Sequence, residues 1–180
     1  SNNEAIVKRM EYLTTRLETL VNVMHHHIDT QIANASPALQ AMPFETIDAH
    51  ASLQQILLDY PFSTSSMREA VRIDLQEDFV FMGVQAAWNQ VINNILKNAI
   101  YALTVCKGQF ASGDITFAIG VKGEYGFLSI TDRGVGMTKS TQRNIFQPFY
   151  SSQRGASHGL GLAYCTRVIT AFGGSLSVIS

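Results

Sequence analysis

The residues best able to do chemistry fall into four short patterns, and the first is a pair of asparagines, Asn94 and Asn98. They belong to the run Asn-Ile-Leu-Lys-Asn-Ala, inside a stretch whose apolar spacing predicts a helix. Because positions four apart share one helix face, both carboxamides are expected to project to the same side. On its own, such a pair is more often two surface amides than a site.

The second pattern is Asp132-Arg133-Gly134-Val135-Gly136-Met137, which directly follows a predicted strand. An acidic residue followed by two alternating glycines would let the backbone approach a flat ligand closely. The same residues also make a common turn sequence, so this pattern is weak evidence by itself.

Two further patterns complete the set. Ile145-Phe146-Gln147-Pro148-Phe149 places two aromatic side chains about a proline, and these would hold down an otherwise flexible loop. Gly159-Leu160-Gly161-Leu162 opens the last predicted helix, where exposed amides and the helix dipole favour a phosphate. Each pattern is modest evidence alone, but the four patterns in this order and in these structural contexts are strong evidence for a functional site.

The elements that must position these patterns alternate along the chain. Apolar periodicity and glycine or proline breaks predict helices at 47–58, 84–105 and 160–172, and strands at 71–75, 79–81, 115–121, 127–131 and 176–179. The two strands around Gly123 are predicted to form a hairpin, and residues 132–158 are predicted to be a functional loop.

The N-terminal part follows a different pattern. Residues 4–33 contain neither proline nor glycine, which permits one long helix. A heptad seam runs along it and predicts a partner helix; its members are Ile6, Met10, Leu13, Leu17, Leu20 and Met24. Pro37 and Pro43 bracket a short linker in which this helix must have ended.

Composition excludes several classes of function. The 180 residues carry 13 Lys and Arg against 14 Asp and Glu, so the chain is not a general binder of nucleic acid or membrane surfaces. Cys106 and Cys165 read as buried thiols of a cytosolic protein. The uncharged run at 79–96 contains five carboxamides and is not a transmembrane helix, and we expect no export signal.

Together the four patterns closely resemble the N, G1, F and G2 boxes of histidine-kinase ATP-binding domains, in the family that includes gyrase, Hsp90 and MutL ATPases. The resemblance covers residues 44–180 and implies an α/β two-layer sandwich, with a mixed, mostly antiparallel sheet covered on one face by helices. Residues 1–36 resemble the second helix of the kinase dimerisation hairpin, and 37–43 form the linker. The chain is also similar to quorum-sensing sensor kinases.

The resemblance implies a role for each polar site residue. Asn98 would give its side-chain oxygen to a Mg²⁺ ion bridging the phosphates of ATP, and Asn94 would bind a phosphate or a metal-bound water. Asp132 would accept a hydrogen bond from the adenine amine and so select ATP over GTP. Lys97 and Tyr101 lie near the site by spacing.

The remaining implied roles concern loops and helix ends. Gly134 and Gly136 would form a close backbone wall of the adenine pocket. Phe146 and Phe149 would anchor a lid at residues 150–158. Amides of the last pattern would meet the phosphates; its residues are Gly159, Leu160, Gly161 and Leu162.

The sequence departs from its relatives at informative positions. Hydrolytic relatives have Glu at the position of Asn94, and an amide cannot act as a general base, so the site is suited to phosphoryl transfer rather than hydrolysis. After Ser151-Ser152, Gln153 stands where relatives often have Lys. Either Arg154 supplies the cation for the phosphate instead, or the γ-phosphate is held less tightly. His158 replaces the usual Thr or Ser, and Ser180 precedes the last strand expected of the family.

The histidines do not match the kinase acceptor. His25, His26 and His27 lack the acceptor's following acidic residue and proline, so we interpret them as helix-surface residues, with adventitious metal binding as the alternative. His50 is interpreted as structural.

The resemblance therefore implies a cytoplasmic histidine kinase portion that uses ATP and Mg²⁺, dimerises through its hairpin and meets a membrane only through other segments. It would phosphorylate a histidine upstream and pass the phosphoryl group to an aspartate of a response regulator or receiver domain. The alternatives are a protein-serine kinase of the anti-sigma type and a degenerate nucleotide-binding module that regulates a partner.

Overall fold

The computed structural model describes residues 9–10, 13–14, 16, 41–150 and 159–180. The chain divides into two compact units, Ser1–Ala35 and Ser36–Ser180. In the first unit Met10 and Leu13 are exposed, and the Thr14 hydroxyl donates to the Met10 carbonyl at 2.9 Å. Most of the predicted heptad seam and the run from His25 to His27 lie outside the described residues.

The second unit contains two small sheets rather than the single sheet predicted. A two-stranded antiparallel sheet pairs β1 with β3, and a three-stranded sheet has the order β2-β4-β5. In the larger sheet β2 runs parallel to β4, and β5 runs antiparallel to it. The strands are β1 (Glu45–Asp48), β2 (Val71–Leu75), β3 (Val80–Gly83), β4 (Ile115–Lys122) and β5 (Tyr125–Asp132).

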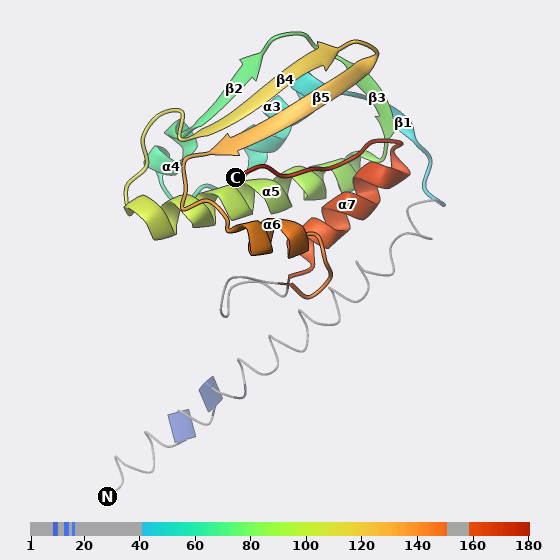
Figure 1. The fold of residues 1–180 in the computed structure, drawn as a ribbon. Coiled ribbons are helices and arrows are strands. Elements are labelled where there is room, and N and C mark those ends of the chain that lie inside the picture. Colours follow the sequence, from blue (N-terminus) through green and yellow to red (C-terminus); the bar gives the residue numbers. More distant parts are fainter. Residues whose placement is uncertain (1–8, 11–12, 15, 17–40, 151–158) are drawn as a thin grey trace, which may run out of the picture. The chain divides into compact units, whose positions relative to one another are not determined.

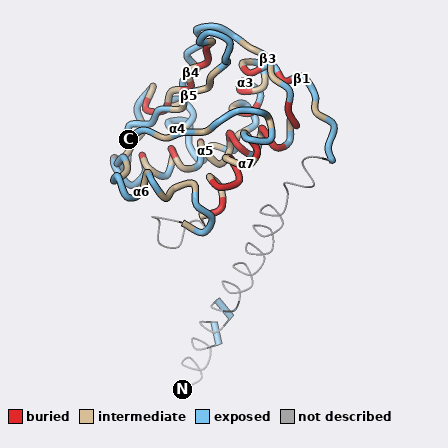
Figure 2. Tube along the Cα trace, turned by 45° about the vertical axis from the view of Figure 1, so that its right-hand side comes forward, coloured by how far each residue is buried: buried red, intermediate tan, exposed pale blue. Residues whose placement is uncertain are grey.

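Helices cover one face of the larger sheet, as Figure 1 shows for α3, α5 and α7. Alternate side chains of β4 supply the sheet's part of the core, with Ile115, Phe117 and Ile119 fully buried. Figure 2 shows the buried residues concentrated between the two layers. The helices are α3 (Ala49–Asp59), α4 (Ser65–Glu69), α5 (Gln85–Lys107), α6 (Lys139–Asn144) and α7 (Gly161–Ala171).

The longest of these helices, α5, is the central support of the unit. Its buried residues follow the i, i+3, i+4 pattern that a helix with one face in the core requires: Trp88, Val91, Ile92, Leu96, Ala99 and Leu103. The Glu45 carboxylate of β1 accepts a hydrogen bond from the first helical amide, Gln85 N, at 3.3 Å. Gly108, with φ +64°, ends the helix in the left-handed conformation that glycine adopts without strain.

An aromatic cluster fixes the far end of α7 against the smaller sheet. The Phe172 ring lies 5.6 Å from the Phe44 ring and 6.0 Å from the Phe81 ring. Phe81 in turn packs edge-on against Trp88 of α5, at 4.9 Å between ring centres. The position of α7 relative to α5 is therefore set at this end by ring packing.

Three predictions about elements are wrong. The predicted strand at 176–179 does not form: residues 174–180 have no regular structure, and the Ser180 hydroxyl instead accepts from Met137 N at 2.7 Å. The predicted loop at 132–158 contains α6, whose N-cap Thr138 accepts from Thr141 N at 3.1 Å. The helix predicted from residue 47 begins at Ala49, because Asp48 caps it by accepting from Ala51 N at 2.7 Å.

Within the described ranges, no helix combines the length and the apolar character needed to cross a membrane.

Candidate functional site

The two asparagines of α5 have different surroundings. Both are partly buried, but only Asn94 is engaged. Its Nδ2 donates to the Gly161 carbonyl at 3.4 Å, and its Oδ1 accepts from Gln90 Nε2 at 3.3 Å. Asn98 makes no side-chain hydrogen bond to the residues that the structure describes, so its amide oxygen is available to a ligand.

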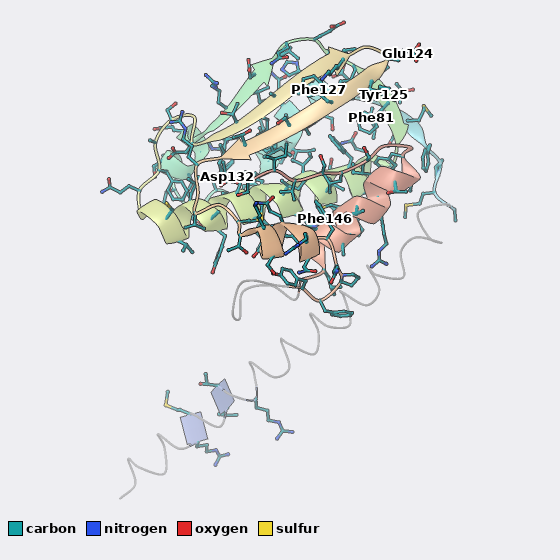
Figure 3. All side chains as sticks on the ribbon, viewed as in Figure 1. Phe81, Glu124, Tyr125, Phe127, Asp132 and Phe146 are labelled. Carbon is teal, nitrogen blue, oxygen red and sulfur yellow. The ribbon has the colours of Figure 1, made fainter. Side chains whose placement is uncertain are left out.

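Asp132 stands at the end of β5, above α5 (Figure 3). It is exposed, and its Oδ1 accepts a hydrogen bond from Gly134 N at 2.9 Å. Arg133 N donates to the Asp114 carbonyl at 3.0 Å and fixes the same turn from the other side. The second carboxylate oxygen of Asp132 remains available to a donor on a ligand.

Gly134 brings this turn into direct contact with α5. A Cβ built at Gly134 would lie 2.6 Å from the Ala102 Cβ and 2.9 Å from the Ala102 carbonyl carbon. Side chains at both positions must therefore stay small. Since Ala102 is one helical turn beyond Asn98, this packing places the turn after Asp132 over the part of α5 that carries Asn98.

Further along the turn, Gly136 has φ +67°, where a residue with a side chain is strained. A Cβ there would lie 3.1 Å from the Ser180 hydroxyl. Lys97 and Tyr101 are exposed on α5, in the stretch between Asn94 and Ala102.

The two phenylalanines about Pro148 differ from the expectation that both anchor the following loop. Phe146 is partly buried near α6 (Figure 3), whereas Phe149 is 66% exposed. Phe149 also has φ +65°, the only positive value for a non-glycine residue in the described ranges. Only Phe146 is buried enough to anchor the loop. Phe149 instead has a strained backbone conformation just before Tyr150.

The start of α7 is built from Gly159, Leu160 and Gly161. Gly159 has φ +67°, and a Cβ there would overlap the Tyr150 carbonyl and lie 2.7 Å from the Phe149 carbonyl carbon. Gly159 therefore lies directly against Tyr150. Leu160 is buried at 5% exposure and fixes this end in the core.

The amino end of α7 has neither a side-chain cap nor an acidic residue in its first turn. Its first amides, which include that of Leu162, thus keep their hydrogen-bonding capacity and the positive end of the helix dipole for an anion. The predictions for Ser151, Ser152, Gln153, Arg154 and His158 fall outside the described residues.

We predict that alanine destabilises the fold at Gly159 but not at Gly161. Gly159→Ala should lower the free energy of unfolding by at least about 1–2 kcal/mol, because the left-handed backbone and the contact with Tyr150 both oppose a methyl group. At Gly161 a Cβ would lie at 3.5 Å from Asn94 Cγ, an ordinary contact, so the fold should tolerate the change. Denaturant unfolding measures both values.

ATP titration of the Gly161→Ala variant then tests the anion role. Weaker binding with unchanged stability is expected, since the methyl group would occupy space beside the amides. A strongly destabilised Gly161→Ala variant, or a fully stable Gly159→Ala variant, would contradict this division.

A buried thiol lies behind Asn94. Cys165, one turn into α7, is fully buried, and its Sγ donates to the Val91 carbonyl at 3.7 Å. Burial raises the pKa of Cys165 to about 12, while a hydrogen bond with Asn94 acts in the opposite direction. The thiol is therefore protonated at neutral pH and serves packing rather than nucleophilic chemistry.

Sequence reasoning missed three residues that shape the site: Gln90, Ala102 and Cys165. The spacing of four between Gln90 and Asn94 is a signal that could have found the first. Cys165 was correctly predicted to be buried, whereas Cys106, predicted to be buried as well, is exposed. Only the three-dimensional packing shows the contacts of Ala102 and Cys165 with the site.

This donor set fits a metal held through a phosphate better than a metal held by protein alone. Among the described residues, no three His, Cys, Asp or Glu side chains gather at metal-binding spacing. The Asn98 amide oxygen is a suitable single ligand for a hard cation whose other ligands are phosphate and water oxygens. The site thus combines a carboxylate, an amide oxygen and the amino end of a helix, which are groups suited to binding a purine nucleoside triphosphate.

Comparison with known sequences finds the family described as "Histidine kinase-, DNA gyrase B-, and HSP90-like ATPase" over residues 83–180. Among curated relatives, the CAI-1 autoinducer sensor kinase/phosphatase CqsS of Vibrio cholerae is 27% identical over 71% of this chain and 18% of its own length. The autoinducer 1 sensor kinase/phosphatase LuxN of Vibrio campbellii is 28% identical over 81% of this chain and 16% of its own length. This chain thus spans less than a fifth of either relative.

Solved structures show the same fold at low identity. The catalytic domain of histidine kinase ThkA superposes with a TM-score of 0.61 at 19% identity, over 73% of this chain and 82% of that one. Histidine kinase AdeS of Acinetobacter baumannii gives a TM-score of 0.61 at 23% identity, over 89% of this chain and 74% of its own.

Proposed function

Because the chain belongs to the histidine kinase-, DNA gyrase B- and HSP90-like ATPase family, we propose that it is the ATP-binding catalytic part of a sensor histidine kinase. The observation that carries the proposal is the contact between Gly134 and Ala102, which brings the turn after Asp132 onto the asparagine helix. It supports one site that holds the adenine at one end and the phosphates near α7.

The residues of this chain would divide the work of binding. Asp132 accepts a hydrogen bond from the adenine amine through the oxygen that Gly134 does not use. Asn98 offers its amide oxygen to Mg²⁺, and the amino end of α7 meets the phosphates. Mg²⁺, when bound, would neutralise phosphate charge during transfer.

The chemistry proposed is transfer rather than hydrolysis. Asn94 cannot remove a proton from water, and its amide is already shared between Gln90 and Gly161. The nucleophile is then the imidazole of a histidine outside this chain, and catalysis is positioning plus electrostatic stabilisation. From it the phosphoryl group would pass to an aspartate of a response regulator or receiver domain.

We place the chain in the cytoplasm, as part of a kinase that dimerises through a helical hairpin that includes residues 1–36. The names of CqsS and LuxN describe both kinase and phosphatase activity, and both names refer to autoinducers. A signalling role in response to an autoinducer is accordingly part of the proposal.

The test incubates the chain with γ-labelled ATP and Mg²⁺, alone and with a separate polypeptide that carries the acceptor helix. We expect acid-labile, base-stable label on the second polypeptide only. Label on His25, His26 or His27 of the chain alone would overturn the placement of the acceptor. Tight ATP binding without label in either mixture would favour a regulatory nucleotide-binding module instead.

A further inference from the structure

Asn94 is one point at which α5 and α7 meet through polar groups. One turn earlier on α5, Gln90 donates to its Oδ1 at 3.3 Å, and across the helix pair its Nδ2 donates to the Gly161 carbonyl at 3.4 Å. Asn94 Cγ lies 3.5 Å from the position of a Cβ at Gly161. The side chain is thus held from two sides by groups of opposite hydrogen-bonding character.

These two partners select the same orientation of the amide. A carbonyl can only accept, so Gly161 requires the NH₂ end of Asn94. Gln90 presents its Nε2, which is a donor, and so pairs with the oxygen end of Asn94. Rotating the Asn94 amide alone by half a turn would place its oxygen against the Gly161 carbonyl and its NH₂ group against the Gln90 NH₂ group.

We propose that Gln90 is a positioning residue for the nucleotide site: it fixes the amide of Asn94 with Nδ2 on the Gly161 carbonyl and Oδ1 on Gln90. This inference rests on the proposed function, in which Asn94 binds a phosphate or a metal-bound water. An amide oxygen has two acceptor sites, and Gln90 uses one. The other can accept from a metal-bound water without any rotation of the side chain.

The orientation also matters for α7. The Gly161 carbonyl belongs to the first residue of that helix, so the Asn94 amide ties the helix start to α5. A misoriented Asn94 would both lose this tie and present its NH₂ group, instead of its oxygen, to a metal-bound water. Gln90 therefore acts on metal-dependent binding through Asn94, without contact to the nucleotide.

The test is the substitution Gln90→Met, which keeps the length and helix propensity of an exposed side chain and removes its donor. ATP affinity is measured with and without Mg²⁺. We expect roughly two- to tenfold weaker binding in Mg²⁺ and little change without it, the range for one neutral hydrogen bond. An equal loss in both conditions would overturn the proposal.

Gln85→Met is the matched control. Gln85 is on the same helix and donates to Asn89 Oδ1 at 2.7 Å, with the same spacing of four, and to the Ser52 hydroxyl at 2.8 Å. This pair is tied to α3 through Ser52 rather than to the start of α7, and its loss should leave the Mg²⁺-dependent part of ATP affinity unchanged. A loss as large as that of Gln90→Met would mean that helix stability, not orientation, explains the effect.

A second background tests whether Gln90 acts through Asn94. In an Asn94→Ala protein, Gln90→Met should cause no additional loss of Mg²⁺-dependent affinity. A loss of the same size as in the native background would overturn the proposal.

A nucleotide-free measurement separates this inference from the proposed function. The side-chain NH₂ resonances of Asn94 should shift in Gln90→Met without ATP, and stay in place in Gln85→Met. That shift together with no ATP binding by the native chain would support the orientation device and overturn the kinase proposal. Unchanged Asn94 resonances with intact Mg²⁺-dependent ATP binding would overturn the orientation device alone.

Discussion

Replacing Asp132 by asparagine is expected to weaken ATP binding by about 1.5–3 kcal/mol, or roughly ten- to 150-fold. The amide keeps one oxygen for Gly134 N, so the turn after β5 should retain its shape. The other end becomes an NH₂ group, which faces the adenine amine donor to donor. Calorimetric titration with ATP measures the loss.

Asp74→Asn is the matched control, because Asp74 is an exposed carboxylate on β2, the strand at the opposite edge of the sheet from β5. It removes the same charge and should leave ATP affinity unchanged. Unchanged binding in Asp132→Asn as well would remove Asp132 from the adenine pocket. GTP should bind the native chain weakly, since its carbonyl oxygen would face the carboxylate.

Asn98→Ala is expected to abolish most of the Mg²⁺-dependent gain in ATP affinity while altering metal-free binding much less. The predicted loss in Mg²⁺ is again about ten- to 150-fold, on the scale of an interaction with a charged group. The fold should persist, because Asn98 makes no side-chain hydrogen bond within the described residues and alanine favours a helix. Titrations in Mg²⁺ and in a chelator measure the two affinities.

Asn93→Ala provides the control on the same helix, one position before the face shared by Asn94 and Asn98. The ATP affinity of the Asn93→Ala variant should depend on Mg²⁺ as strongly as that of the native chain. If Asn98→Ala weakens binding equally with and without the metal, Asn98 packs against the nucleotide or supports the fold instead.

The fold was predictable where local pattern and long-range packing agree. The apolar period of α5, the alternation in β2 and the glycine turn between β4 and β5 all correspond to the observed elements. Two-layer α/β architecture is confirmed. The strand predicted at 176–179 failed because alternation alone does not supply a pairing partner, and Ser180 bonds to the turn at Met137 instead.

Less of the site could be predicted, because its geometry depends on contacts between distant segments. The sequence identified the asparagine pair, Asp132 and the glycines by type and spacing. It did not show that Gly134 needs a small residue at Ala102, or that Gly159 contacts Tyr150 while Gly161 has room for a methyl group. It also gave Phe149 a buried anchor's role, although that side chain is mostly exposed.

One nucleotide is expected to bind between α5, the turn after β5 and the start of α7. The most direct measurement follows backbone amide resonances during titration with ATP and Mg²⁺. We expect the largest shifts at residues 94–102, 132–137 and 159–163, with a smaller response to GTP. Shifts confined to other surfaces, such as the groove of about 430 Å³ lined by Leu57, Phe62 and Ile73, would contradict it.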